Sequence, residues 1–463
     1  MKLHDYAPLN TQTDEIRLLR IVQMGDVLEA EIQHFVIGDD CPEFGAVSYL
    51  WGTPQSNLTI KIGSTSLRVA PNAYAALSIL AEYQFAFLLM DEIGCEDCED
   101  WEQQPEWLWI DSICINQADI GERNHQVSMM RKIYGSAATV YSWLGNGSPR
   151  VFSAMRMLRD FTYKEFMHRQ YEEDISYCRD DFDFDASELS DGLYELFSNP
   201  YWKRIWMVQE FIIGKWVVVL CGKMRISWDQ IGMFFFNRFR QSKFEILHLR
   251  VATRLQSTPA NPLIQCRNAM SVSKESLEIE RPWAGHLLSH LTKVFEGWGS
   301  SDPRDKVYAL IGLVGSGPEV DYAKSTGEVF DDTMKFYIEH SRFQAAYVVR
   351  LFAESLARSL RLGERKIRAI SYLRDGVCVF PESPRGLVVG KNFVICPHGA
   401  HCFEWEAANM GDADSSEKEI GVGTIRRRQH VFRESRWTVE EELVVSSGDG
   451  LMDNLRLVLC QCV

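Results

Sequence analysis

The feature that most constrains this chain is a set of four short β-rich runs, separated by stretches with helical periodicity. The runs are Phe44–Leu50 (FGAVSYL), Glu106–Ile110 (EWLWI), Ala138–Leu144 (ATVYSWL) and Lys215–Leu220 (KWVVVL). Such apolar runs are typical of buried strands, and long helical connections between strands are typical of parallel sheets. We therefore predict an α/β fold with a doubly wound parallel sheet and helical insertions.

Helix signals lie between these runs. Pro71 opens a segment in which Ala73 and Leu77 recur at helical spacing, which predicts a helix after the first strand. Asp119 with Glu122 three residues later is a typical helix start, and it predicts a helix between the second and third strands. The apolar face of that helix is expected to contain Val127, Met130, Ile133 or Tyr134, and Ala137.

The remaining patterns divide the chain into four regions. A further helix is predicted over residues 194–213. After it we expect mainly helices, with Arg304 and Asp305 forming an ion pair or a cap at a helix start, and then an uncertain, β-containing tail. The predicted regions are a lead-in (1–40), the α/β domain (41–225), an associated helical region (226–350) and the C-terminal region (351–463).

Composition and charge exclude some classes of binding partner, namely nucleic acids and membranes. The chain has 463 residues, with 49 basic against 64 acidic side chains and a formal charge of -15, so it repels nucleic-acid backbones and anionic lipid surfaces. The N-terminus lacks the apolar core of a signal peptide, and the apolar runs are shorter than a membrane span. We expect a cytoplasmic protein that binds neither nucleic acid nor membranes.

Two groups of cysteines are candidate metal sites. Cys95 and Cys98 form a C-x-x-C in an acidic stretch that has no second pair nearby. The string from Cys396 to Cys402 holds four possible ligands, but such tight spacing rarely lets all of them reach one tetrahedral metal. The twelve cysteines are thinly spread and are interpreted as mostly reduced thiols, so we predict no metal site.

Polar residues stand at the ends of the first two predicted strands. In open parallel sheets, ligands bind beyond the carboxyl ends of the strands, so both groups would face one crevice. The alternative is that the amide side chains order the loops through hydrogen bonds to their own backbone. The candidate ligand-contacting residues are Ser48, Trp51, Gly52, Asp111, Asn116 and Gln117.

Three blocks carry a resemblance to a known family. They are FGAVSYLWG, LWIDSICINQADIGERNHQVSMMRKIYGSAATVYSWLG and YWKRIWMVQE. Their order and spacing resemble the heterokaryon incompatibility (HET) domain of filamentous fungi over roughly residues 41–222, and SDPRDKVYALIGL resembles a segment that commonly follows it. The resemblance implies a role in non-self recognition and in programmed cell death after fusion of unlike cells.

A second, more remote resemblance concerns the chemistry. The order of strand, polar loop, helix and strand, followed by Tyr201, Trp206 and Glu210, is similar to Toll/interleukin-receptor (TIR) domains. In the NAD-cleaving members of that superfamily, a W-x-x-x-E helix carries the catalytic glutamate, and Trp206 and Glu210 have that spacing. The resemblance therefore implies Glu210 as the catalytic residue and Trp206 as part of the substrate pocket.

The two residue types also fit this chemistry by themselves. Trp206 and Glu210 are four residues apart, so on a helix they share one face. Nicotinamide leaves NAD as an already cationic group, so one carboxylate that stabilises the developing ribosyl charge is sufficient. The alternative is that Trp206 belongs to the core and Glu210 pairs with an arginine such as Arg204 at the surface. We predict NAD as a substrate rather than a cofactor.

The sequence leaves two functional hypotheses open. The first is a cell-death effector of non-self recognition that hydrolyses NAD at the nicotinamide–ribose bond. The second is a non-enzymatic module that works through self-association or through an incompatibility partner protein.

Overall fold

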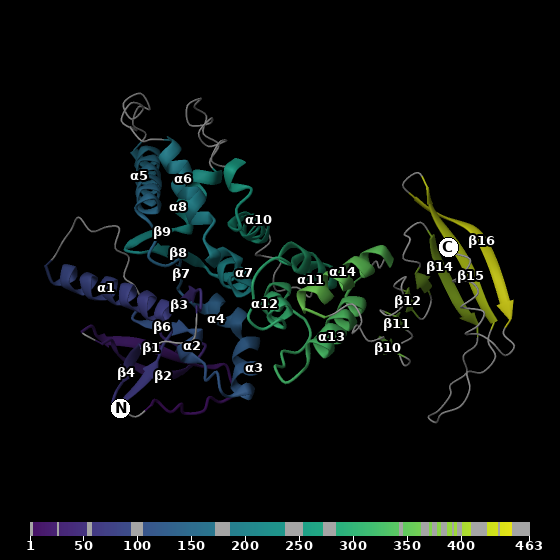
Figure 1. Cartoon of the computed structure of the whole chain (residues 1–463), viewed down its shortest axis with the longest axis horizontal. Coiled ribbons are helices and arrows are strands. Elements are labelled where there is room, and N and C mark those ends of the chain that lie inside the picture. Colours follow the sequence, from purple (N-terminus) through teal and green to yellow (C-terminus); the bar gives the residue numbers. More distant parts are fainter. Residues whose placement is uncertain are drawn as a thin grey trace. The chain divides into compact units, whose positions relative to one another are not determined.

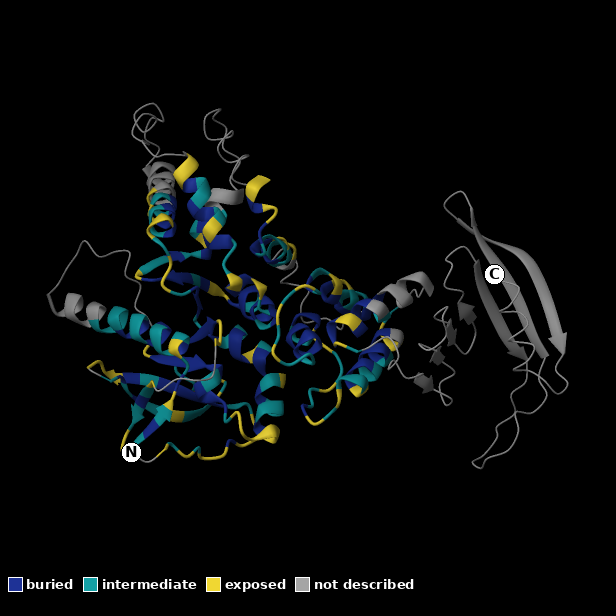
Figure 2. Ribbon diagram, in the orientation of Figure 1, coloured by how far each residue is buried: buried dark blue, intermediate teal, exposed yellow. Residues whose placement is uncertain are grey.

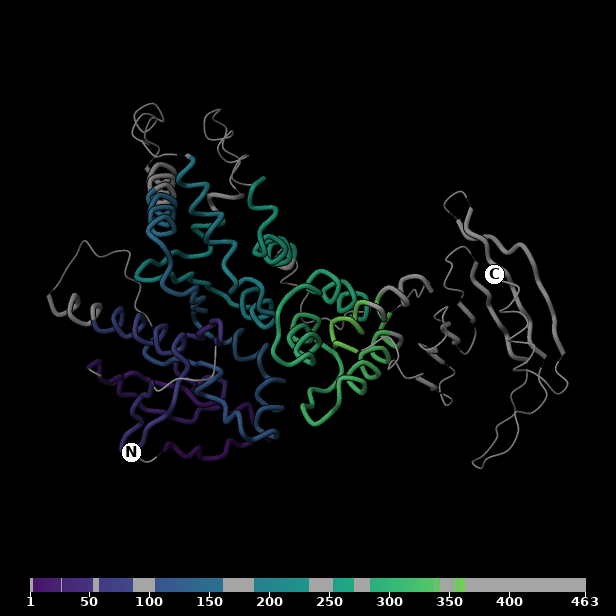
Figure 3. The backbone as a smooth tube through the Cα atoms, in the orientation of Figure 1, coloured from purple at the N-terminus to yellow at the C-terminus, as the bar shows by residue number. Residues whose placement is uncertain are grey.

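The structure is a computed structural model that falls into two compact units (Figures 1 and 3). Unit 1 contains Met1–Glu280 and Gly297–Ala323, and unit 2 contains Arg281–Glu296 and Lys324–Val463. Described are residues 3–93 apart from 26 and 53–57, then 105–171, 186–236, 253–271, 284–341 and 346–362, and the strands between 370 and 446. Cys95, Cys98 and residues 396–400 lie outside the described residues, so the two cysteine groups remain untested.

Unit 1 is built on a nine-stranded sheet in the order β5-β4-β2-β1-β6-β3-β7-β8-β9 (Figure 1). The four neighbouring strands β6, β3, β7 and β8 are parallel to one another, and they correspond to the four β-rich runs of the sequence. The strands are β1 (Glu15–Gln23), β2 (Glu29–Val36), β3 (Phe44–Tyr49), β4 (Thr59–Ile62), β5 (Thr65–Arg68), β6 (Trp107–Ile110), β7 (Thr139–Trp143), β8 (Trp216–Cys221) and β9 (Met224–Ser227).

The α/β class is confirmed, but the sheet is mixed rather than wholly parallel. The pairs β1–β2, β4–β5 and β8–β9 are antiparallel, as is β1 with β6. The three sequential pairs are joined by short loops, and a short loop can only connect antiparallel strands. Residues 1–40, predicted as a lead-in, supply β1 and β2 to the same sheet as the α/β domain.

Helices connect the parallel strands. In Figure 1, α1 lies on one side of the central strands and α3, α4 and α7 lie on the other. The predicted helix at Pro71 is confirmed as α1. The connecting helices are α1 (Pro71–Ile93), α2 (Asp111–Cys114), α3 (Ile120–Ser128), α4 (Met130–Ser136), α5 (Pro149–Tyr171), α6 (Ala186–Phe197), the 3-10 helix η1 (Pro200–Lys203) and α7 (Ile205–Ile213).

Two predicted helices are interrupted. Asp119 does cap α3 by accepting a hydrogen bond from the Glu122 amide at 3.0 Å, but the helix breaks at Met129. The Ser128 hydroxyl donates to a helical carbonyl at 2.7 Å and so competes with the backbone ladder there. The segment 194–213 is not one helix because Pro200 lacks an amide hydrogen, so α6 ends before it and η1 begins.

The helical region after the sheet is confirmed where it is described. Unit 1 adds α8 (Trp228–Phe236), α10 (Ala260–Ser271) and α12 (Asp305–Val314). Unit 2 contains α11 (Ala284–Val294), α13 (Thr326–Glu339) and α14 (Ala346–Ser359). The β-containing tail is a seven-stranded antiparallel sheet of β10 (Ile370–Tyr372), β11 (Val377–Phe380), β12 (Leu387–Gly390), β13 (Phe393–Ile395), β14 (His401–Ala408), β15 (Thr424–Arg433) and β16 (Arg436–Ser446).

The core of unit 1 surrounds the parallel strands (Figure 2). All six residues of β3 and all four of β6 are buried, and Trp109, Trp143 and Trp202 have no exposed surface. Packing on both faces fixes the strand ends, from which the candidate site residues project. None of the described helices combines the length and the apolar character needed to span a bilayer.

Candidate functional site

A charged cluster, defined here as Ser48, Asp111, Arg204 and Glu210, lies inside unit 1. Ser48 stands near the carboxyl end of β3, Asp111 follows β6 directly, and Glu210 lies in α7. One terminal nitrogen of Arg204 is 3.1 Å from Glu210 Oε1, and the other is 3.1 Å from Asp111 Oδ2. Ser48 donates a hydrogen bond to Glu210. Three predicted site residues therefore meet around one arginine.

Glu210 is the most deeply buried member of the cluster. Its exposed fraction is 0%, whereas Asp111 keeps 6%. Burial raises the pKa of Glu210 above its ordinary value, the positive charge of Arg204 opposes this shift, and Asp111 adds to it. With both carboxylates ionised, the cluster carries one net negative charge. Proton uptake or a cationic ligand would neutralise it.

Arg204 is the partner that the structural alternative named, but the pair lies inside the protein and not at its surface. The Arg204 side chain is 11% exposed. Burial alone would lower the pKa of Arg204, but the negative charges of Glu210 and Asp111 outweigh this effect. The net pKa is raised, so the guanidinium stays charged. Its backbone is held by Gly299, which accepts a hydrogen bond from the Ile205 amide at 2.9 Å. The segment that precedes α12 thus fixes Arg204.

Three further hydroxyl groups surround the cluster. The Tyr201 and Ser48 oxygens are 2.7 Å apart, and because Ser48 gives its proton to Glu210, Tyr201 is the donor. The hydroxyls of Tyr134 and Ser142 are buried and complete no well-formed hydrogen bond with any described residue. Burial raises the pKa of Tyr201 and of Tyr134, so both remain neutral donors.

Trp51 and Gly52 form the exposed edge of this site. The Trp51 indole nitrogen donates to Asp111 Oδ2 at 2.8 Å, while 38% of the side chain is exposed. Gly52 has a φ of 69°, a left-handed conformation that disfavours a side chain. An accessible aromatic surface therefore adjoins the less buried of the two carboxylates.

Asn116 and Gln117 order the loop after β6. The Asn116 side chain accepts a hydrogen bond from the Ala118 amide at 3.2 Å, and Gln117 donates to the Asp111 carbonyl at 3.0 Å. These are the local bonds that the loop-ordering alternative required. Gln117 thus holds the backbone of Asp111, whereas Asn116 orders the turn at Ala118.

Trp206 is half-buried and faces α12 rather than the two carboxylates of the charged cluster. Its side chain lies beside Asp305, which accepts a hydrogen bond from the Tyr322 hydroxyl at 2.6 Å. Arg304 pairs with Asp302 at 2.7 Å, so the ion-pair alternative for Arg304 and Asp305 is wrong. The predicted helix start is confirmed, because α12 begins at Asp305 with Arg304 in the cap position, although no side chain caps it. Adjacent side chains at a helix start point in different directions, which separates Arg304 from Asp305.

Comparison with known proteins identifies the domain around the cluster. The family model of the heterokaryon incompatibility protein (HET) matches residues 44–210, from the start of β3 to Glu210. This part of the chain is similar to HET domains. It is 28% identical over 339 residues to heterokaryon incompatibility protein 6, OR allele, of Neurospora crassa, a match that covers 64% of this chain and 48% of that relative. The chain thus matches about half of that relative's length. No solved structure matches the chain.

The region that matches the family model contacts a buried residue that precedes it. Arg17 of β1 donates two hydrogen bonds to the Glu122 carboxylate, at 2.5 and 2.9 Å, and one to the Cys114 carbonyl at 3.0 Å. The two charged side chains are 1% and 5% exposed. The sequence analysis treated Glu122 as a helix-start residue and missed this pair. An arginine flanked by apolar residues in β1 was the available signal.

The thiol of Cys114 does not act as a nucleophile. It is buried, and burial raises the pKa of its thiol to about 12, so the thiolate does not form at neutral pH. The side chain of His125 contacts the Thr13 carbonyl at 3.1 Å. Among the described residues no group of three or more His, Cys, Asp and Glu side chains is arranged to hold a metal.

Proposed function

We propose that this chain acts in heterokaryon incompatibility as a cell-death effector, and that its HET domain hydrolyses NAD at the nicotinamide–ribose bond with Glu210 as the catalytic residue. The observation that carries the proposal is the charged cluster itself, in which two buried carboxylates share one arginine at the carboxyl edge of the parallel strands. The HET-domain match and the incompatibility relative support the biological role.

The position of the cluster supports a ligand site. Numbered in chain order, the four parallel strands lie in the order 2-1-3-4. In doubly wound sheets of this order, ligands bind where the first and third strands meet, which here is between β3 and β7. Ser48 and Ser142 are paired across that junction. This strand order is also what the proposed TIR-like character of the domain rests on.

The charges of the cluster complement those of NAD. NAD carries a positive pyridinium ring and two negative phosphates, while the cluster offers two carboxylates and one guanidinium. Hydrolysis breaks the bond between the nicotinamide nitrogen and C1 of the ribose, and the nitrogen keeps the electron pair. Water adds to the ribosyl cation and releases a proton, which gives ADP-ribose. Glu210 stabilises that cation, and Trp51 offers a flat surface for the ring.

Substrate binding requires Arg204 to move, because it occupies the oxygens of Glu210 together with Ser48. The pyrophosphate of NAD is a stronger partner for a guanidinium, since it presents two charged groups for paired hydrogen bonds. In this proposal Arg204 exchanges the carboxylates for the pyrophosphate. Glu210 is then free to face the ribose.

The test is release of nicotinamide from NAD by purified protein at several protein concentrations. Glu210→Gln keeps the shape of the side chain but removes the charge, and loss of one such electrostatic contact slows the chemical step by about a hundredfold or more. The matched control is Glu31→Gln, which alters an arginine-paired carboxylate of the same sheet that lies outside the cluster and is partly exposed. Equal rates for wild type and Glu210→Gln would refute the catalytic role.

The second candidate is a non-enzymatic signalling module, favoured by the complete burial of Glu210. In that case the cluster only holds β3, α2 and α7 together. The two candidates separate when wild type and Glu210→Gln are expressed in cells at matched levels, with NAD content and growth measured. Growth arrest by both proteins at unchanged NAD identifies the non-enzymatic module.

A further inference from the structure

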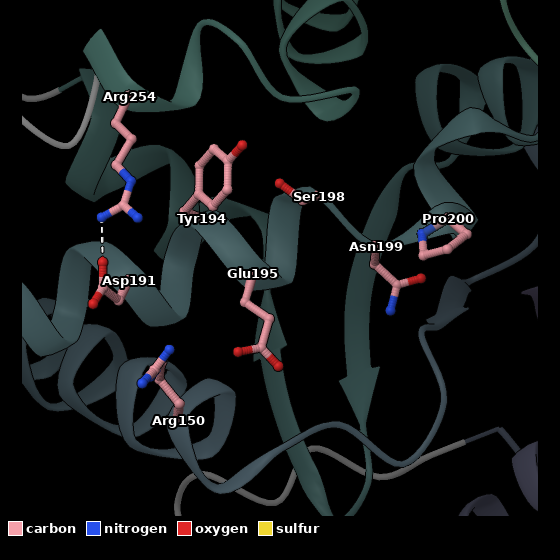
Figure 4. Close-up of a pocket in the computed structure, with 8 residues that line it drawn as sticks. All are labelled: Arg150, Asp191, Tyr194, Glu195, Ser198, Asn199, Pro200 and Arg254. Carbon is pink, nitrogen blue, oxygen red and sulfur yellow. Dashed lines mark hydrogen bonds and ion pairs between the residues drawn. The ribbon is translucent and has the colours of Figure 1, made fainter.

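A separate polar cavity lies beside η1 in unit 1 (Figure 4). Its volume is about 510 Å³, within the range of small-molecule sites in proteins. Its residues come from the first turn of α5, from α6, from the start of η1 and from a segment before α10. They are Arg150, Asp191, Tyr194, Glu195, Ser198, Asn199, Pro200 and Arg254.

The charges in this cavity are unequally satisfied. Arg254 and Asp191 form an ion pair, and the Arg254 guanidinium lies 4.7 Å from the centre of the Tyr194 ring. Arg150 and Glu195 form no ion pair with another described residue, although both line the same cavity. The Ser198 hydroxyl is shielded from solvent and has no hydrogen-bond partner among the described residues. The cavity thus offers one cation, one anion and one unsatisfied hydroxyl.

We infer that this cavity binds the adenylate half of the dinucleotide. Arginine pairs with phosphate through parallel hydrogen bonds, so Arg150 is the phosphate contact. An acidic side chain accepts hydrogen bonds from ribose hydroxyls in dinucleotide sites, which is the role assigned to Glu195. Tyr194, which is held by Arg254 and only half-buried, offers a ring surface for the base. A purely anionic ligand would not use Glu195.

The cavity and the charged cluster belong to the same edge of the sheet. Asn199 of the cavity donates to the carbonyl of Leu144, the residue after β7, at 2.9 Å. Two residues later, Tyr201 contacts Ser48 of the cluster at 2.7 Å. Two virtual bonds of 3.8 Å keep the Cα atoms of Asn199 and Tyr201 within about 8 Å, a span that an extended dinucleotide exceeds. The inference that one molecule reaches both places rests on the proposed function.

The first test uses AMP and ADP-ribose as probes for the full-length protein, with binding measured by calorimetry. Arg150→Gln is expected to weaken both ligands by about tenfold, which is the loss of one charged contact, and Glu195→Gln is expected to weaken them less. The control is Arg156→Gln, an exposed arginine of the same helix that does not line the cavity. Absence of AMP binding to wild type at about 1 mM, or equal binding to Arg150→Gln, would overturn the inference.

The second test separates this inference from the proposed function. Nicotinamide riboside has the scissile bond but no adenylate, so Arg150→Gln is expected to raise KM for NAD and leave cleavage of the riboside unchanged. If NAD is not cleaved but AMP binding depends on Arg150, the cavity stands as a nucleotide site and the proposed hydrolysis falls. If NAD is cleaved and KM is unaffected by Arg150→Gln, the proposed function stands and the inference falls.

Discussion

Removal of the Glu122 carboxylate is expected to destabilise the α/β domain strongly, although Glu122 takes no part in the proposed chemistry. In the folded protein this carboxylate accepts bonds at 2.5 and 2.9 Å from Arg17 and one at 2.6 Å from the Asn116 amide. Glu122→Ala leaves the Arg17 guanidinium, 1% exposed, without its counter-charge. Breaking one partner of such a buried pair costs about 3–5 kcal/mol.

The matched control is a more exposed pair whose arginine lies in the same strand, β1, and whose glutamate lies in β2. Arg20 and Glu31 lie 2.6 Å apart with 37% and 33% of their side chains exposed, and removal of such a pair costs about 0–1 kcal/mol. Urea unfolding of wild type, Glu122→Ala and Glu31→Ala, followed by tryptophan fluorescence, measures both losses. The argument fails if Glu122→Ala unfolds at the same urea concentration as Glu31→Ala. The double variant Arg17→Met/Glu122→Leu should recover much of the loss, because it buries no charge.

Two further predictions concern the core. Burial raises the pKa of Asp305 from 3.8 to about 6, so ionisation of Asp305 destabilises the folded protein as pH rises between these values. The unfolding free energy of Asp305→Asn relative to that of wild type should therefore increase by about 2–3 kcal/mol from pH 4 to pH 7. A difference that stays constant with pH would contradict the burial argument. Gly45→Ala places a Cβ 2.4 Å from a Tyr141 ring carbon, and such overpacking costs about 1–3 kcal/mol. The control is Gly38→Ala, whose added Cβ meets no atom within 4 Å. Equal melting temperatures for the two variants would refute the predicted overpacking.

The sheet was predictable to the extent that its strands are buried on both faces. The four parallel strands are continuous apolar runs, and such runs identify central strands of α/β sheets. β1 and β2 were missed because charged residues interrupt their apolar runs, although β1 buries one of these residues, Arg17. The breaks at Met129 and Pro200 depend on single hydrogen-bonding groups. A spacing pattern averages over such groups.

The sequence placed Ser48, Asp111 and Glu210 in one region through the strand-end rule and a four-residue spacing. It could not place Arg204 at their centre. An arginine between two short helices is most often solvated, and its position here depends on a backbone bridge to Gly299, 95 residues away. The contact between Trp206 and Asp305 could not be predicted from the sequence either, because it joins two helices that are far apart in the chain.

Two arginines in one domain are buried against carboxylates, and the difference in their charge balance separates a structural role from a functional one. Arg17 and Glu122 form a one-to-one pair, so the folded protein already compensates both charges. Arg204 faces two carboxylates, Asp111 and Glu210, and the three carry a net negative charge when ionised. A second buried carboxylate costs folding free energy unless something compensates it. Burial accordingly raises the pKa of Glu210. In the proposed function, the pyridinium ring of NAD takes the place of Arg204 beside the two carboxylates, and Arg204 pairs with the phosphates, at the carboxyl edge of the parallel strands.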